Sequence, residues 1–218
     1  MSWHAKPSGG YAYNSVEAED NFREIRNALI NQWTIEAICG AIGNMSGESG
    51  YNPWRWQSDT VNMKLGYGLV QFTPASGYIN DYGVGVENFS PNLSVTGITQ
   101  GATPEDGYAQ CLVLATDKAR KWINRASYCN WYDLSSMKNF SAFKECNDLY
   151  LATIAFMFNY EGNATVLGKN ATLQKNMVEA RYNIAKYAYE LLTGEEPQPP
   201  KPHPKQHKMP IYMMLRRR

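Results

Sequence analysis

Apolar side chains recur at intervals of three and four residues along much of the chain, which is typical of helices that bury one face. Ser15 can cap the first such helix, and we expect it to run to about Asn31. Its buried face would carry Phe22, Ile25 and Leu29. Regular structure is therefore expected to begin near residue 15.

The second helical pattern begins at a capping residue, Thr34, and its apolar row leads toward Glu48. Glycine weakens a helix, so glycines inside this pattern predict that another backbone approaches closely there. The sequence thus predicts a central, buried helix. Its apolar row is Ile35, Ile38, Ile42 and Met45, and its glycines are Gly40, Gly43 and Gly47.

Four further helices are expected from caps and apolar spacing. They are a short one from Thr73-Pro74 to about Tyr82, one from Thr103-Pro104 to about Arg125, one from about Ser141 to Asn159, and one from Thr172 to Thr193 with Gly194 as its C-cap. Between them, residues 50–73 predict a turn-rich lobe with one or two short strands, and residues 83–101 predict a loop. The expected fold is mainly α (α+β), with a small lobe beside a helical domain.

The pattern divides the chain into an irregular segment (1–14), one domain (15–194) and a proline-rich tail (195–218). Prolines at nearly every second position of the tail predict an extended tether. An apolar cluster at 211–215 followed by three arginines is interpreted as a docking peptide. His203 and His207 lie in this tail, where no helix would bring them together, so no metal site is expected.

Composition excludes some classes of protein but does not indicate a function. The chain has 218 residues, of which 44% are hydrophobic, enough for one well-filled core. A formal net charge of +1 argues against a nucleic-acid binder, and no apolar run is long enough to span a membrane. The first residues lack the apolar core of a signal peptide, so we expect synthesis in a cytoplasm. The many aromatic residues, 15 Tyr and 6 Trp, suit sugar stacking, although most are expected to fill the core.

The four cysteines have no metal-ligand spacing. Cys39 and Cys111 lie in apolar periodic segments and are interpreted as buried small hydrophobes. Cys129 and Cys146 flank a loop-rich stretch, where a disulfide is one option. No metal or organic cofactor is indicated.

Glu48 is the strongest candidate for chemistry. It continues the apolar row of its helix by three residues and stands where the helix breaks into a Gly-, Asn- and Pro-rich turn. Desolvation and the negative end of the helix dipole should both favour the protonated carboxyl. A protonated carboxyl in a cleft is what a general acid for glycoside cleavage needs. The alternative is a solvated glutamate at a helix end.

The residues around Glu48 strengthen the catalytic interpretation. Glu48-Ser49 after a helix, followed by Gly68-Leu69-Val70-Gln71, resembles the lysozyme-like superfamily, lytic transglycosylases and goose-type lysozymes in particular. The longer string resembles the bacteriophage tail lysozyme family, closely over about residues 33–82 and less closely to about 193. It comprises residues 37–49, Asn52-Pro53, Trp56-Gln57, residues 68–71 and residues 73–76.

The resemblance implies a cleft with named residues. Glu48 and Gln71 would be catalytic, with Gln71 bonding substrate or orienting water, although it could equally be an ordinary strand amide. Ser49 would orient Glu48 or contact an N-acetyl group, with turn capping as the alternative. The other substrate-binding residues implied are Tyr67, Gly68, Asn159 and Tyr160, and Trp54 or Trp56 could be a sugar platform.

The reaction implied is cleavage of the β-1,4 bond between N-acetylmuramic acid and N-acetylglucosamine. Inverting and retaining hydrolases need a second carboxylate at different distances, whereas a lytic transglycosylase uses the sugar's own 6-hydroxyl. Asp59, Asp81 and Glu161 are candidates that spacing does not separate. The lack of a clear partner slightly favours a mechanism with one glutamate.

Three classes of function remain open at this point. The favoured one is a peptidoglycan hydrolase carried in a phage particle for genome entry, bound to virion proteins through its tail. An endolysin for host lysis is the nearest alternative, and a catalytically inactive lysozyme-fold tail protein is the non-enzymatic one. A secreted chitinase-type glycosidase is disfavoured by the missing signal peptide.

Overall fold

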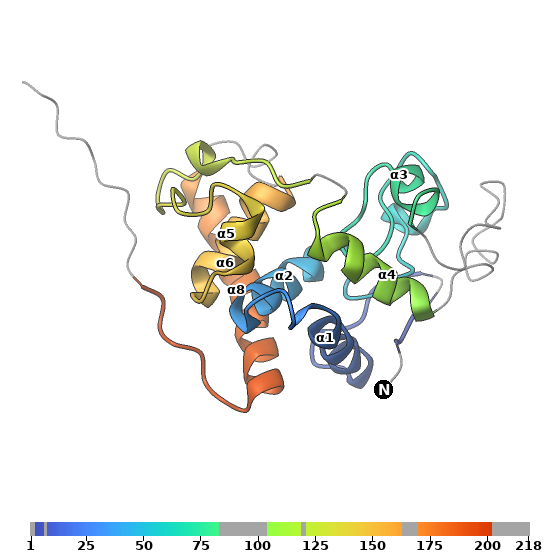
Figure 1. Ribbon diagram of the computed structural model, residues 1–218, viewed down its shortest axis with the longest axis horizontal. Helices are drawn as coiled ribbons and strands as arrows, with labels where there is room; N and C mark the ends of the chain where they lie inside the picture. Colours follow the sequence, from blue (N-terminus) through green and yellow to red (C-terminus); the bar gives the residue numbers. More distant parts are fainter. Residues whose placement is uncertain (1–2, 7, 83–103, 119–120, 163–169, 202–218) are drawn as a thin grey trace, which may run out of the picture.

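The computed structural model describes residues 3–6, 8–82, 104–118, 121–162 and 170–201. Helices dominate this part of the chain (Figure 1), so the fold is mainly α, as predicted. The α-helices are α1 (Val16–Leu29), α2 (Ile35–Glu48), α3 (Ala75–Ile79), α4 (Pro104–Ala115), α5 (Phe140–Lys144), α6 (Leu149–Ala155) and α8 (Ala171–Thr193). Short turns of 3-10 helix occur at η1 (Gln57–Asp59) and η3 (Ala126–Tyr128), and one turn of π-helix forms η4 (Phe156–Tyr160).

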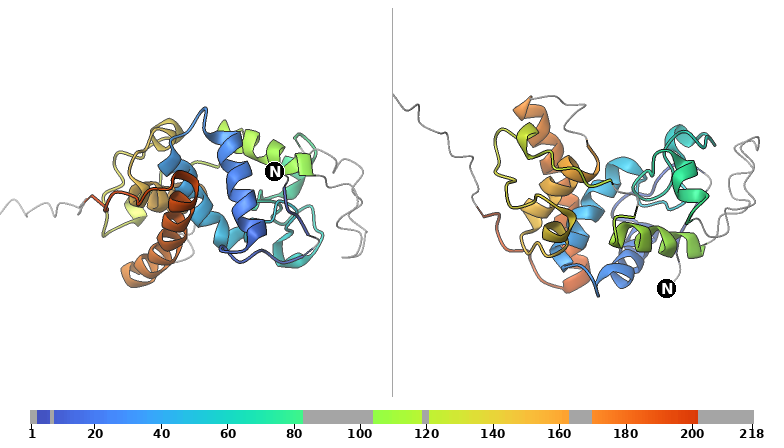
Figure 2. Two further views of the ribbon diagram at one scale, coloured as in Figure 1. Left: turned by 90° about the horizontal axis from the view of Figure 1, so that it is seen from below. Right: turned by 45° about the horizontal axis from the view of Figure 1, so that its top comes forward.

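Helix α2 lies at the centre and connects two parts of the molecule. In Figures 1 and 2, α5, α6 and α8 lie on one side of it, and α1, α3 and α4 lie on the other. Every residue of α2 from Ala37 to Met45 is buried. Because α2 is apolar around its whole circumference, it is stable only when other elements enclose it. Helices α1, α6 and α8 provide this enclosure.

Close backbone contacts explain the glycines of α2. A Cβ atom at Gly40 would lie 2.9 Å from backbone atoms of Ala152 in α6. One at Gly43 would overlap the carbonyl oxygen of Arg181 in α8. The predicted close approach is therefore confirmed, and it lets α2 pack against both helices at once.

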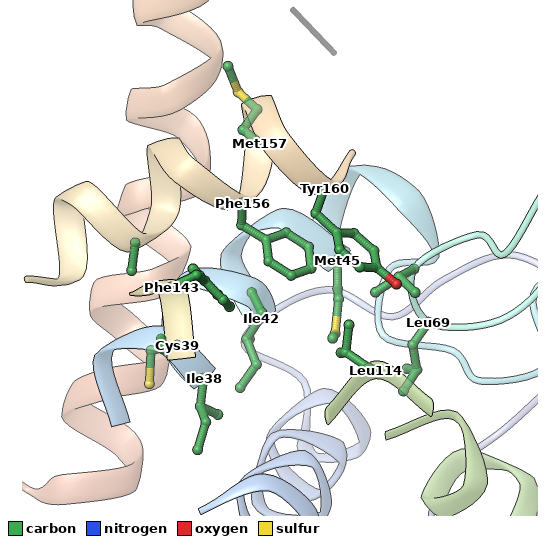
Figure 3. Close-up of a cluster of buried hydrophobic side chains, with 14 of the residues drawn as sticks. Ile38, Cys39, Ile42, Met45, Leu69, Leu114, Phe143, Phe156, Met157 and Tyr160 are labelled. Atoms are coloured by element: carbon green, nitrogen blue, oxygen red, sulfur yellow. The ribbon is translucent and has the colours of Figure 1, made fainter. Parts of the chain in front are cut away.

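The core continues from α2 into the turn-rich lobe. Figure 3 shows Ile38, Ile42 and Met45 in one row along α2, with Tyr160 and Leu69 near its end. These side chains are buried, with exposed fractions of 3% or less. One apolar core therefore extends across both sides of α2 and reaches the end that carries Glu48.

The predicted caps form. Ser15 accepts a hydrogen bond from the N–H of Ala18, and Thr34 accepts one from the N–H of Ala37. Gly194 ends α8 in the left-handed conformation, with φ of 75°. Helices bounded by a clear cap at the sequence level thus begin or end where expected.

Three predicted helices were too long. The helix from Thr103 ends at Ala115, where Asp117 takes a positive φ of 49°. The helix expected over 141–159 is divided into α5, α6 and η4. Helix α5 ends at Lys144, and the Asp148 side chain then caps α6 by accepting a hydrogen bond from the N–H of Leu151. Helix α3 stops at Ile79, before the predicted end at Tyr82.

The strand predicted at Leu69–Val70 is wrong. These two residues lie in a tight turn, where the N–H of Gln71 donates to the carbonyl of Gly68 at 3.1 Å. Tyr67 and Phe72 pair on either side of that turn, and Trp56 pairs with Tyr67. Among the described residues the lobe contains only these isolated bridges. The loop expected over 83–101 lies outside the described residues.

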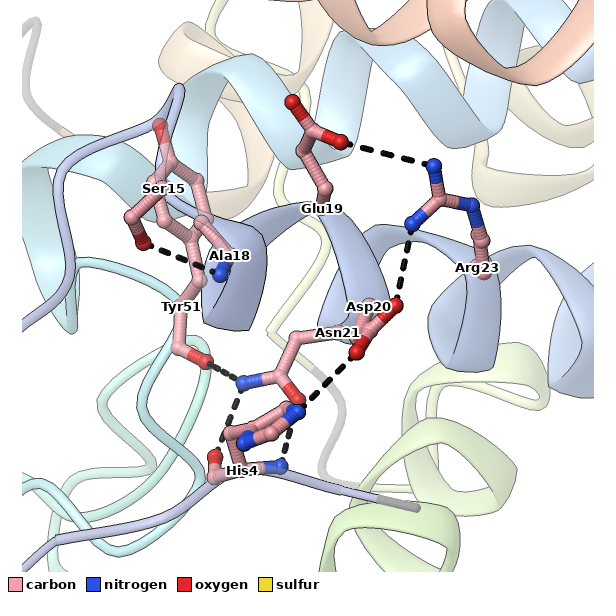
Figure 4. A network of polar contacts seen from close by, with 8 residues as sticks. All are labelled: His4, Ser15, Ala18, Glu19, Asp20, Asn21, Arg23 and Tyr51. Carbon is pink, nitrogen blue, oxygen red and sulfur yellow. Dashed lines mark hydrogen bonds and ion pairs between the residues drawn. The ribbon is translucent and has the colours of Figure 1, made fainter. Parts of the chain in front are cut away.

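The described residues before α1 are held in place by side-chain amides (Figure 4). The Asn21 side chain bonds the N–H and the carbonyl of His4 at 2.8 Å each, and it also donates to the Tyr51 carbonyl. The side chain of Asn52 donates to the Lys6 and Gly9 carbonyls. The segment therefore joins α1 to the turn-rich lobe through buried amides.

The cysteines and the tail add two details. All four cysteines are buried free thiols, so the disulfide considered between Cys129 and Cys146 is absent. After Gly194 the chain extends to Lys201, whose carbonyl accepts a hydrogen bond from the Tyr132 hydroxyl at 3.1 Å. The histidines and the apolar cluster of the tail lie outside the described residues. Within the described part, no helix is both long and apolar enough to cross a membrane.

Replacing Gly43 by alanine should destabilise the protein by about 1–3 kcal/mol, because α2 and α8 would have to separate. Gly77→Ala is the matched control: its Cβ would meet nothing within 4 Å. Since alanine favours helix over glycine, that variant should be neutral or slightly stabilised. Thermal unfolding of both variants measures the difference, and equal melting temperatures would contradict the close packing at Gly43.

Candidate active site

Glu48 lies at the edge of a polar cleft with a volume of about 480 Å³. Its side chain is 20% exposed. The cleft runs between the end of α2, the turn-rich lobe and the segment after η4. It is lined by Gly47, Glu48, Arg55, Gln57, Ser58, Gln71, Thr73, Lys121, Tyr160 and Glu161.

The end of α2 fixes Glu48 at this place. Ser49 forms the C-cap, and its N–H donates to the Met45 carbonyl at 3.0 Å. Gly50 then takes a positive φ of 54°, which favours glycine and turns the chain away from the helix axis. Glu48 is consequently the last residue held by the rigid, buried helix.

A second carboxyl, that of Glu161, enters the cleft from η4. The N–H of Glu161 bonds the carbonyl of Phe156 at 3.1 Å, five residues back, so the wide π-helical spacing continues to this residue. Such turns recur at functional sites because they shift side chains relative to an α-helix. The Glu161 carboxyl lies within hydrogen-bonding reach of Glu48, and its Oε1 atom is buried without a partner.

Two cations accompany the carboxyls. Arg181, from the buried face of α8, places Nη2 3.8 Å from Oε1 of Glu48. A Cβ at Gly47 would lie 2.9 Å from that guanidinium, so glycine there leaves the room that Arg181 occupies. Lys121 donates from Nζ to the carbonyls of Val70 and Gln71, at 2.9 and 3.1 Å.

Burial dominates the electrostatics of the cluster. Burial raises the pKa of Glu161 well above its usual value, and repulsion from Glu48 raises it further, while Lys121 and Arg181 oppose the rise. Burial also lowers the pKa of Lys121, against the attraction of Glu161, Glu48 and Asp117. Burial and the charge of Glu48 thus both favour the protonated form of Glu161.

Gln71 reaches the cleft but uses its amide nitrogen internally. Nε2 donates to the carbonyls of Arg55 at 3.1 Å and Gly68 at 3.0 Å. Both hydrogens are then engaged, so only Oε1 could meet a ligand or a water. The backbone of Gln71 has a positive φ of 47°, and its side chain holds this strained turn.

Three residues implied by the resemblance lie behind the cleft rather than in it. Ser49 is fully buried and donates from Oγ to the Leu69 carbonyl at 2.8 Å. Tyr67 is 1% exposed and donates to Asp106 at 2.9 Å. Gly68 has a φ of 82° and lies against Gln110. Their geometry shapes the turn that carries Gln71, and substrate contact by Ser49 or Tyr67 would need both to become exposed.

A buried network around Asp106 holds that turn on α4. The hydroxyls of Tyr67 and Tyr78 donate to the Asp106 carboxylate at 2.9 and 2.6 Å. The Gln110 amide donates to it at 2.8 Å and accepts from the N–H of Leu69 at 2.7 Å. The sequence interpretation missed this network because Asp106 and Gln110 lie 28 to 41 residues along the chain from the lobe residues that they bond.

Asn159 and Tyr160, the two binding residues predicted at the end of the helix over 141–159, differ in their position relative to the cleft. Asn159 is fully buried: Oδ1 accepts from the N–H of Arg125 at 2.7 Å, and Nδ2 donates to Met137 at 2.9 Å. Tyr160 lines the cleft, with its ring 5.2 Å from the Lys121 ammonium. Tyr160 is only 3% exposed, so contact with a ligand in this cleft would need its ring to shift, and Asn159 is out of reach.

Of the three candidates for a second carboxylate, one lies at Glu48. Glu161 lines the same cleft, as described above. Asp59 does not line it: its Oδ1 accepts from Arg55 at 3.0 Å and from the N–H of Gly9 at 2.8 Å. Asp81 is exposed just after α3 and is likewise absent from the lining.

Neither tryptophan lines the cleft. Trp56 is 1% exposed and stacks at a tilt on Tyr67, and Trp54 packs partly buried against the core. Arg181 and Lys121 were missed in the sequence. The available signal was Arg181 itself, a charged residue on the apolar face of α8 between Val178 and Ala185. Lys121 follows the early end of α4 and had no comparable signal.

No metal centre is formed by the described residues: none of them makes a group of three or more His, Cys, Asp or Glu side chains suited to an ion. General acid chemistry on an oxygen leaving group is within the capacity of the site, since a carboxyl and its charge partners converge on one open cleft.

A carboxyl presented at the end of a buried central helix, facing a turn-rich lobe, is the arrangement of the lysozyme-like fold. The chain belongs to the phage tail lysozyme family, whose model matches residues 20–192. It is also similar to Morphogenesis protein 1 of Bacillus phage B103, with 50% identity over 72 residues. That match covers 32% of this chain and 20% of the relative, so it spans about a fifth of the relative's length. The chain is thus a phage lysozyme-like protein.

Asp106→Asn should destabilise the protein by about 2–3 kcal/mol, because an amide nitrogen would face buried donors that now meet a carboxylate oxygen. Asp81→Asn makes the same chemical change at an exposed position and should stay within about 0.5 kcal/mol of the unmodified protein. Chemical denaturation measures both variants. Equal stability of the two would show that the Asp106 network does not hold the lobe.

Proposed function

We propose that this protein cleaves the β-1,4 bond between N-acetylmuramic acid and N-acetylglucosamine in bacterial peptidoglycan, with Glu48 as the general acid. The observation that carries the proposal is the position of Glu48, at the end of α2 and on an open polar cleft. Membership of the phage tail lysozyme family supports it. The substrate would be a glycan strand lying along the cleft.

In this proposal Glu48 donates a proton to the glycosidic oxygen as the C1–O bond breaks. The positive charge that develops on the sugar ring is then next to the Glu48 carboxylate, which stabilises it. Arg181, with Nη2 3.8 Å from Oε1 of Glu48, holds the carboxylate in place. The Oε1 atom of Gln71, on the lining of the cleft, offers the substrate a hydrogen-bond acceptor.

The carboxyl pair favours a lytic transglycosylase over a hydrolase. A hydrolase needs its second carboxylate roughly 5–9.5 Å from the acid, facing the other side of the sugar. Among the described residues, the carboxylates lining the cleft are Glu48 and Glu161, and these two interact with each other. Attack by the sugar's own 6-hydroxyl requires no second carboxylate across the cleft and would leave an anhydro product.

The setting we propose is the phage particle, where the enzyme opens the wall for genome entry. The family and the similarity to a phage morphogenesis protein support a virion role over a late lysis role. In this proposal the tail beyond Lys201 binds other virion proteins. The competing functions are an endolysin and an inactive structural tail protein.

Glu48→Gln should keep the fold and lose roughly two to four decades of activity, the contribution of one general acid. A zymogram on purified cell walls, with melting temperature as the folding control, tests this. Residual activity above about a tenth of the unmodified level would remove Glu48 from the acid role. The mass of the released muropeptides then separates the reactions, since an anhydro product lacks one water.

Deletion of residues 202–218 should leave cleavage of soluble wall fragments intact, because the deletion spares the contact between Tyr132 and Lys201. The same deletion should lower the number of copies in purified particles, counted by quantitative immunoblot. Loss of cleavage by the truncated enzyme would place the tail in the catalytic unit. An unchanged copy number would contradict its docking role.

A further inference from the structure

The cluster at the base of the cleft contains two carboxyls that come from different elements and meet at one point. Glu48 ends α2, and Glu161 follows η4. Both line the cleft, and they lie within hydrogen-bonding reach of each other. Two carboxylates in such contact cannot both be ionised without strong repulsion, whereas one proton between them turns the contact into a hydrogen bond.

We propose that Glu161 is a positioning residue for Glu48, and that the two carboxyls hold one proton between them at neutral pH. The catalytic part of this proposal rests on the function proposed above. The pair would keep a proton next to the glycosidic oxygen at a pH where an isolated, solvated glutamate is ionised. Glu161 itself would not touch the bond that breaks.

The surroundings of Glu161 favour the neutral carboxyl. Its Oε1 atom is buried and has no hydrogen-bond partner. Leaving a buried oxygen ionised and unpaired costs more than leaving a neutral one unpaired. Burial and the neighbouring Glu48 act in the same direction on the pKa of Glu161, as described above.

Several charged and titratable groups lie around this pair. Arg181 of α8 lies 3.8 Å from Glu48, and Arg55 of the lobe lines the cleft and pairs with Asp59 at 3.0 Å. Lys121 lies in the same cleft, but its ammonium donates to two backbone carbonyls and forms no ion pair with either carboxyl. Tyr160 directly precedes Glu161 in the chain. The Arg125 guanidinium donates to the carbonyls of Phe158 and Asn159, in the turn before Glu161. The Asp117 carboxylate attracts the Lys121 ammonium and accepts a hydrogen bond from the backbone N–H of Lys121.

The proton count of the pair closes over one turnover. The pair gives one proton to the glycosidic oxygen as the C1–O bond breaks, and both carboxyls are then briefly without it. The hydroxyl that attacks C1, from the sugar or from water, returns one proton as the new C–O bond forms. Glu161 therefore changes how readily Glu48 is protonated, while the bonds made and broken remain those of the proposed reaction.

The first test does not depend on activity. Above the usual glutamate value of 4.5, Glu161 ionises in the unfolded chain but stays protonated in the folded one. Folding stability of the unmodified protein should therefore fall with rising pH at this residue. Glu161→Gln removes that loss, so its melting temperature minus that of the unmodified protein should rise from about pH 4.5 toward neutral pH.

The matched control is Glu190→Gln, an exposed position on α8. Its melting-temperature difference should be flat over the same range. A difference for Glu161→Gln that falls with pH would overturn the proposal, because Glu161 would then be ionised and paired with a cation. Failure of Glu161→Gln to fold would also overturn it, since an amide reproduces the shape and the donor of a protonated carboxyl.

The second test is the pH profile of wall cleavage. In Glu161→Gln the amide cannot hold the shared proton, so the proton that serves the reaction should be lost at lower pH. The alkaline limb of the profile should move down by about one pH unit or more, and Glu161→Asp should restore part of the shift. An unshifted limb would overturn the role of Glu161. If the unmodified protein cleaves no wall, the proposed function is refuted. The shared proton is still tested by the melting experiment, which does not depend on activity.

Discussion

The close packing of α2 against α6 and α8 is the constraint on which the rest of the structure depends. Gly40 and Gly43 let the two helices approach the backbone of α2, so the helix is enclosed from Ala37 to Met45. A rigid, enclosed helix has one free end near the surface, and Glu48 is there. The position of the carboxyl therefore follows from packing some distance away rather than from bonds made by the carboxyl itself.

The same packing delivers the charge partners of Glu48. Helix α8 crosses α2 at Gly43, which places Arg181 beside Gly47, and the missing side chain at Gly47 leaves space for the guanidinium. Helix α6 crosses α2 at Gly40 and continues through η4 to Glu161. The three glycines therefore have separate effects. Gly40 admits the helix that leads to Glu161, Gly43 admits α8, and Gly47 leaves room for the Arg181 guanidinium.

Features that depend on neighbours in sequence could be predicted from the sequence. The caps at Ser15, Thr34 and Gly194, the buried rows of α1 and α2, and the candidacy of Glu48 all follow from residues within a turn or two of one another. The breaks at Ala115 and Asp148 were missed because apolar spacing continues across them. At Asp148 a side-chain cap on the N–H of Leu151 starts a new helix, and at Asp117 a positive φ follows the end of α4, so both breaks are local features that apolar spacing does not reveal.

Features that depend on distant residues could not be predicted in this way. Leu69 and Val70 have the composition of a strand, yet they form a turn because Ser49, Gln110 and Lys121 each bond a backbone group of that segment. Glu161 was one of three equivalent candidates until η4 placed it beside Glu48.

Lys121 shows how these distant contacts converge on the site. Its ammonium bonds the carbonyls of Val70 and Gln71 and lies over the rings of Phe72 and Tyr160, at 5.5 and 5.2 Å. A compact ammonium can satisfy two carbonyls and two ring faces at once, where a planar guanidinium would have to choose one plane. Lys121 therefore connects the turn at Val70 and Gln71 to the ring of Tyr160. It also adds a positive charge near Glu48 and Glu161 without pairing with either, so the two carboxyls remain free to interact with each other.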